Sequence, residues 1–150
     1  MSAFKITTDI CFALLLLLCA DSDRRIREIP REFLWGLVLL GILRFGYVIG
    51  IGDSPWSCLC AAPLFCVLLI FWNTGQIGGG DVKLMTLMCF FLGMYQTVVA
   101  FALTAIFLGA YSVLRVLRNK DKAHTRIPHA PSLALGGIGV LSIRYVMTLI

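Results

Sequence analysis

Two aspartates stand where long apolar segments of this 150-residue chain meet polar ones. Asp23 opens the sequence Asp-Arg-Arg-Ile-Arg-Glu-Ile-Pro, and Asp81 closes Gly-Gly-Gly-Asp. An ionisable side chain at membrane depth is costly and is usually functional. Two carboxylates that share a site hold one proton between them, so that one can take a proton from water while the other polarises a carbonyl. Such a pair can hydrolyse a peptide bond if folding brings the two residues together.

The composition is that of a membrane protein. Hydrophobic residues make up 59% of the chain and charged residues 14%, whereas soluble domains have about 25% charged residues. The length accommodates about six spans of roughly 20 residues, joined by short loops. We therefore expect an all-α, polytopic integral membrane protein in which residues 1–150 form a single membrane-embedded domain.

Apolar segments and the polar residues between them predict the order of the spans. The predicted spans are residues 3–22, 33–51, 56–72, 82–93, 97–117 and 131–150. The fourth is too short to cross the bilayer vertically on its own. Residues 73–81 are expected to be a glycine-rich loop, in which the missing Cβ atoms let a substrate backbone approach Asp81. A cleaved signal peptide is the alternative interpretation of the first apolar segment, although the arginines that follow it resist translocation.

Basic residues predict the orientation in the membrane. They gather after the first and fifth spans, at Arg24, Arg25, Arg27, Arg31, Arg115, Arg118, Lys120, Lys122 and Arg126. Because cytoplasmic loops carry such clusters, this face is expected to be cytoplasmic, with both termini outside. The order of spans places Asp23 and Asp81 on that same face. Arg44 and Arg144 lie inside spans but toward their outer ends, where long side chains can snorkel, and the sequence assigns them no role. Asp9 is spaced to pair with Lys5.

Other functions for the polar residues are disfavoured. The six cysteines lie in or beside apolar segments without a Cys-x-x-Cys pair, which is typical of small apolar side chains between helices. We predict no metal and no cofactor. The basic clusters lack interleaved aromatic residues and a soluble fold, so nucleic acid is not an expected partner. The glycine-rich segment lacks the Gly-Lys-Ser/Thr ending of a phosphate-binding loop.

Three motifs, taken together, resemble those of the type IV prepilin peptidases, which are membrane aspartyl proteases of the GxGD class. Their residues here are Asp23, Arg27 and Pro30, then Gly78, Gly80, Asp81 and Lys83, and finally Pro128 and Pro131. The resemblance implies that Asp23 and Asp81 are the catalytic pair and that the other residues support them. Asp21 is out of register with the proline of the first motif. Arg31 and Ala130 depart from the residues usual in the family.

The resemblance implies a bacterial inner-membrane endopeptidase that cleaves the short basic leader from prepilins or pseudopilins at the cytoplasmic face. The expected partners are this substrate and the lipid bilayer. The chain starts directly at a span, without the Cys-x-x-Cys domain that long members associate with N-methylation. It therefore resembles the short, peptidase-only members found with tight-adherence pili. The alternatives are a small proton-coupled transporter, whose acidic residues would lie near the bilayer midplane, and a non-catalytic assembly factor of a pilus or secretion system.

Overall fold

The computed structural model describes residues 3–26, 29–52, 56–75, 77–118 and 130–147. These residues form seven helices and their connecting turns: α1 (Ala3–Ile26), α2 (Arg31–Gly50), α3 (Trp56–Leu59), α4 (Ala61–Asn73), α5 (Gly79–Leu92), α6 (Met94–Arg118) and α7 (Ala130–Met147). The predicted all-helical architecture is confirmed for this part of the chain. The cysteines differ in burial: Cys19, Cys58 and Cys89 are buried between helices, whereas Cys11 and Cys66 are exposed.

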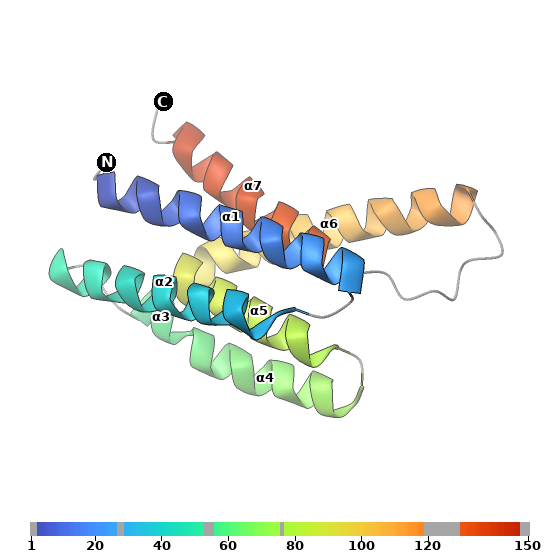
Figure 1. Ribbon diagram of the computed structural model, residues 1–150, viewed down its shortest axis with the longest axis horizontal. Helices are drawn as coiled ribbons and strands as arrows, with labels where there is room; N and C mark the ends of the chain where they lie inside the picture. The colour runs from blue at the N-terminus through green and yellow to red at the C-terminus, as the bar shows by residue number, and fades with distance from the viewer. Residues whose placement is uncertain (1–2, 27–28, 53–55, 76, 119–129, 148–150) are drawn as a thin grey trace.

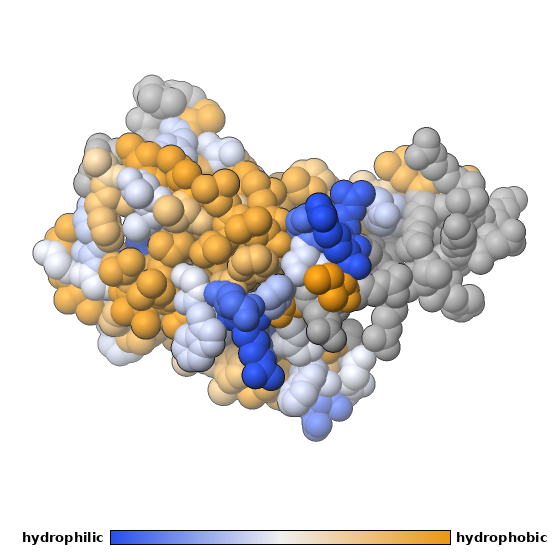
Figure 2. All heavy atoms as spheres, in the orientation of Figure 1, coloured by the Kyte–Doolittle hydropathy of each residue, from blue (hydrophilic) through white to orange (hydrophobic). Residues whose placement is uncertain are grey.

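Four helices are long and apolar enough to cross a membrane, namely α1, α2, α6 and α7. Helix α4 is apolar but shorter, and α5 has 14 residues, which corresponds to about 21 Å of helix. The chain is therefore a polytopic membrane protein in which two segments are shorter than the hydrocarbon core. Figure 2 shows apolar residues over most of the visible face, with the strongly hydrophilic ones gathered toward the end where α1 finishes and α2 begins.

Successive segments of the bundle run in opposite directions, so that the start of α1 and the end of α7 lie at the same end, on the left in Figure 1. The last turn of α1 and the first turns of α2, α5 and α7 lie at the other end. We call this other end the motif end, because the described residues of all three sequence motifs are found there. The C-terminal half of α6 extends beyond the bundle at the same end.

Helix α5 lies at the centre of the core. Its side chains Leu84, Met88 and Cys89 have no exposed surface. Phe91 of α5 stacks on Phe12 of α1, with ring centroids 4.0 Å apart and an interplanar angle of 6°. Stacked aromatic rings at this separation fix the two helices as direct neighbours.

Glycines allow the neighbouring helices to approach closely, as is common where membrane helices pack. A Cβ atom on Gly41 of α2 would collide with the ring of Phe90, and one on Gly136 of α7 would collide with the carbonyl oxygen of Ala100. A Cβ atom on Gly137 would lie 2.8 Å from Leu16 Cδ1 and 3.0 Å from Met88 Cε. Helices α1, α5 and α7 therefore meet at Gly137.

Two predicted boundaries are wrong. The predicted span 56–72 is interrupted at Cys60, between α3 and α4. Pro63 has no N–H, so the carbonyl of Leu59 loses the donor that would continue the helical ladder. The predicted loop 73–81 is also too long, because α5 already begins at Gly79. An acidic residue in the first turn favours an early helix start through the helix dipole, and Asp81 occupies that turn.

Candidate active site

Asp23 lies near the end of α1 and faces α7. Its Oδ2 atom accepts a hydrogen bond from the backbone N–H of Ala130 at 3.3 Å. Ala130 is the first residue of α7, where backbone N–H groups have no partner within the helix and attract negative charge. Asp21, two residues earlier, is instead exposed and forms an ion pair with Arg25 at 2.9 Å. Of the two neighbouring aspartates, Asp23 is thus the one that contacts another element of the bundle.

Asp81 lies in the first turn of α5, three residues after the N-cap residue Gly78. A Cβ atom on Gly78 would lie 3.3 Å from Asp81 Oδ2, so the carboxylate folds back over the start of its own helix. The positive end of the helix dipole favours a carboxylate at this position. Like Asp23, Asp81 is half-buried.

Side chains from neighbouring segments pack beside the glycines that precede Asp81. A Cβ atom on Gly79 would lie 3.3 Å from Trp72 Nε1, at the end of α4. A Cβ atom on Gly80 would lie 3.4 Å from Ile29 Cδ1. Because Ile29 follows Asp23 in the first motif, this contact joins the first two motifs in space.

The register of α1, α5 and α7 sets the level of the two aspartates. Leu16, Met88 and Gly137 meet at one point. Seven residues from that point toward the motif end lie Asp23 in α1, Asp81 in α5 and Ala130 in α7. Seven residues correspond to about two turns and roughly 10.5 Å, and they return to the same helix face. The contact between Asp23 and Ala130 agrees with this register, so we infer that Asp81 lies at the same level as Asp23.

The other predicted site residues occupy varied positions. Pro30 is the N-cap residue of α2, and Pro131 lies in the first turn of α7, where the missing N–H costs no helical hydrogen bond. Lys83 is exposed, on a different face of α5 from Asp81. Arg27 and Pro128 lie outside the described residues.

Residues 10–114 match the type IV leader peptidase family. The chain belongs to this family. It is 29% identical over 132 residues to the prepilin leader peptidase/N-methyltransferase of Bacillus subtilis (strain 168), covering 86% of this chain and 52% of that relative. The chain therefore spans about half the length of this relative. No solved structure matches it.

Family membership confirms the resemblance inferred from the three motifs. Together with the apolar helices it indicates an inner-membrane protein. The matched residues include both Asp23 and Asp81. Both carboxylates are half-buried, that of Asp23 beside the start of α7 and that of Asp81 in the first turn of α5.

A second charged cluster lies far from the motif end, and sequence analysis missed it. Asp9 of α1 is 2% exposed, and its Oδ2 atom accepts hydrogen bonds from Arg144 Nη2 and, at 2.8 Å, from the Tyr145 hydroxyl. Arg44 Nη1 lies 4.0 Å from Asp9 Oδ1. Arg144 Nη1 also donates to Gln96 Oε1 at 3.3 Å.

The structure thus gives Arg44 and Arg144 a partner inside the bundle, in place of the snorkelling that their positions in the sequence allow. Their side chains are 9% and 13% exposed and lie against the carboxylate of Asp9, which links α1, α2 and α7. Asp9 is engaged here with these arginines rather than through the predicted pairing with Lys5. Opposite charges inside three apolar segments were enough to predict an ion cluster from the sequence, since charged side chains buried in a bilayer almost always pair. Asp9 lies fourteen residues before Asp23, which is about 21 Å along α1.

Proposed function

We propose that this chain is an aspartic endopeptidase that removes the leader of type IV prepilins or pseudopilins, with Asp23 and Asp81 as its catalytic pair. The observation that supports the proposal most is the convergence of the three motifs at one end of the bundle. The N–H of Ala130 contacts Asp23, and Ile29 packs against Gly80. The transporter alternative expects acidic residues at mid-membrane depth, whereas both aspartates stand at helix ends.

In the proposed reaction the two carboxyl groups share one proton. The ionised group removes a proton from water as the water oxygen attacks the scissile carbonyl carbon. The protonated group hydrogen-bonds the carbonyl oxygen and stabilises the negative charge that develops there. The tetrahedral intermediate then collapses, the C–N bond breaks, and the leaving amine takes a proton from the pair. The chain's own residues supply the acid, the base and their positioning.

We further propose that the motif end faces the cytoplasm. Arg24, Arg25, Arg31 and Lys83 are all exposed at this end. Positive residues flanking spans are retained on the cytoplasmic side. At the opposite end the exposed residues beside the turns include Trp56 and Tyr95, at 73% and 82% exposure, and such aromatic residues suit a membrane interface. A leader presented from the cytoplasm would then meet the pair before the pilin is exported.

Co-expression of the chain with candidate prepilins tests the proposed activity. Loss of the leader is followed by the mobility shift of the pilin and by the mass of its new N-terminus. Wild-type protein and Asp21→Asn should cleave, while Asp81→Asn, present in the membrane at the same level, should leave the prepilin intact. Full cleavage by Asp81→Asn would refute the assignment, and failure of wild-type protein on every prepilin tested would favour the assembly-factor alternative.

A further inference from the structure

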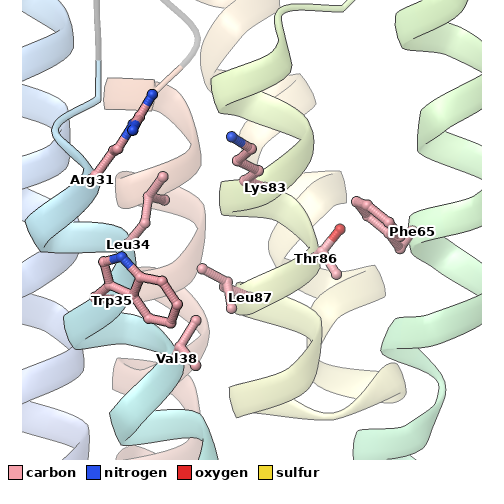
Figure 3. Close-up of a pocket in the computed structure, with 8 residues that line it drawn as sticks. All are labelled: Arg31, Leu34, Trp35, Val38, Phe65, Lys83, Thr86 and Leu87. Atoms are coloured by element: carbon pink, nitrogen blue, oxygen red, sulfur yellow. The ribbon is translucent and has the colours of Figure 1, made fainter.

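A groove of about 390 Å³ lies between α2, α4 and α5. Its walls are mainly apolar, and Figure 3 shows Trp35 of α2 and Leu87 of α5 facing each other across it, with Phe65 of α4 opposite Thr86. Arg31 and Lys83 lie together at one end, above the apolar side chains. The groove therefore has a cationic end and an apolar body.

This groove is separate from the candidate active site. Lys83, Thr86 and Leu87 follow Asp81 by two, five and six residues, which places them about 200°, 140° and 240° around α5 from it. Asp81 instead shares its face with Leu84 and Met88, which are fully buried in the core. The groove thus lies on the opposite side of α5 from Asp81. Binding in the groove therefore does not depend on the proposed peptidase function.

The cationic end lies at the membrane boundary. Arg31 is the first residue of α2 and Lys83 lies in the second turn of α5, so both belong to the motif end. Both side chains are exposed, and no carboxylate is among the described residues that line the groove. Trp35, which is 71% exposed, stands about one turn deeper, at a depth suited to its amphipathic ring. An occupant must therefore combine a negative head with an apolar tail.

The charge and the position of the groove favour a lipid as its occupant. Acyl chains are thin and flexible enough to follow an apolar groove, whose volume is in the range of small-molecule sites. Basic pockets between membrane helices on the cytoplasmic side attract anionic lipid head groups.

We propose that this groove is a binding site for one anionic phospholipid of the leaflet at the motif end. The phosphate lies between the guanidinium of Arg31 and the ammonium of Lys83, and an acyl chain runs along Trp35, Leu87 and Phe65. Because α5 forms one wall of the groove and carries Asp81 on its opposite face, the bound lipid also supports the short central helix from its membrane side.

Native mass spectrometry of the full-length protein, with phosphatidylglycerol or phosphatidylcholine added to the detergent micelle, measures the binding. Wild-type protein should retain phosphatidylglycerol in preference to phosphatidylcholine. The double variant Arg31→Gln/Lys83→Gln should bind phosphatidylglycerol at least about tenfold more weakly. The control Arg24→Gln/Arg25→Gln removes the same charge from exposed residues of the motif end outside the groove, and it should stay within about twofold of wild type. Equal binding by wild type and the groove variant, or equal loss in both variants, would overturn the proposal.

A photo-crosslinking residue in place of Val38, which lines the groove, identifies the occupant without changing any charge. In membranes containing phosphatidylglycerol, the adduct should have the mass of that lipid. An adduct with a prepilin or with a second copy of this chain would show that a protein segment fills the groove, and would overturn the lipid assignment. Circular dichroism confirms that each variant keeps its helical content.

Discussion

The backbone N–H of Ala130 donates a hydrogen bond to Oδ2 of Asp23 at 3.3 Å, although 107 residues separate them in sequence. This contact ties the last helix of the chain to the end of the first. It also places one carboxylate of the proposed pair at the positive end of a helix, where a negative charge is favoured. Ala130 itself is fully buried, so the donor is held by packing on all sides.

Removing this donor should slow peptide cleavage. Replacement of Ala130 by lactic acid, its α-hydroxy analogue, converts the amide to an ester and removes only the N–H. Because a hydrogen bond to a charged group contributes about 1.5–3 kcal/mol, we expect kcat to fall about tenfold or more. The same replacement at Ala134, which also lies in α7, is the control and should have a smaller effect on kcat. An equal loss at both positions would mean that general weakening of α7 is responsible.

The space beside Gly80 should limit which residues can replace it. A Cβ atom there would lie 3.4 Å from Ile29 Cδ1, which is an ordinary contact, whereas the methyl groups of valine would push Ile29 away. We expect Gly80→Ala to keep most prepilin cleavage and Gly80→Val to reduce its rate about tenfold or more. Gly109→Val, at a position with no neighbour within 4 Å, is the control for a β-branched residue in a helix. Wild-type rates in Gly80→Val would show that this contact does not position Asp81.

The buried cluster around Asp9 should matter for stability and not for chemistry. Asp9→Asn removes the carboxylate charge that faces Arg44 and Arg144, and breaking a buried ion pair from one side costs about 3–5 kcal/mol. We expect a clear fall in Tm in detergent, while kcat of the folded fraction stays within about twofold because the cluster is about 21 Å from Asp23. Asp21→Asn, which removes an exposed ion pair, should change Tm little. An unchanged Tm in Asp9→Asn would contradict a stabilising role.

The positions of the helices could largely be predicted from the sequence because local signals fix them. Pro30 precedes α2, and Gly93, whose φ of 83° suits glycine, ends α5. Apolar length identified the four segments long enough to cross a membrane, but it also predicted an uninterrupted span over residues 56–72. The shared end of the two aspartates followed from the alternation of spans. Where local signals competed, at Pro63 and at the start of α5, the predicted boundaries were wrong.

Contacts between helices could not be predicted, because they depend on register. The stacking of Phe12 on Phe91 and the meeting of Leu16, Met88 and Gly137 set the level of α5 against α1, and a shift by one turn would leave every sequence pattern intact. The ion cluster of Asp9, Arg44 and Arg144 also depends on the register of the helices. Each residue is visible in the sequence as a charge in an apolar segment, but its partner is defined only by the packed bundle.

A double-mutant cycle on Asp23 and Asp81 tests the central claim most directly. The rate of prepilin cleavage is measured for wild type, Asp23→Asn, Asp81→Asn and the double variant, with membrane levels matched. If the carboxylates act as one unit, each single variant loses about three orders of magnitude or more and the double variant loses no more than either. Independent, additive losses, or substantial activity in either single variant, would contradict the proposed pair.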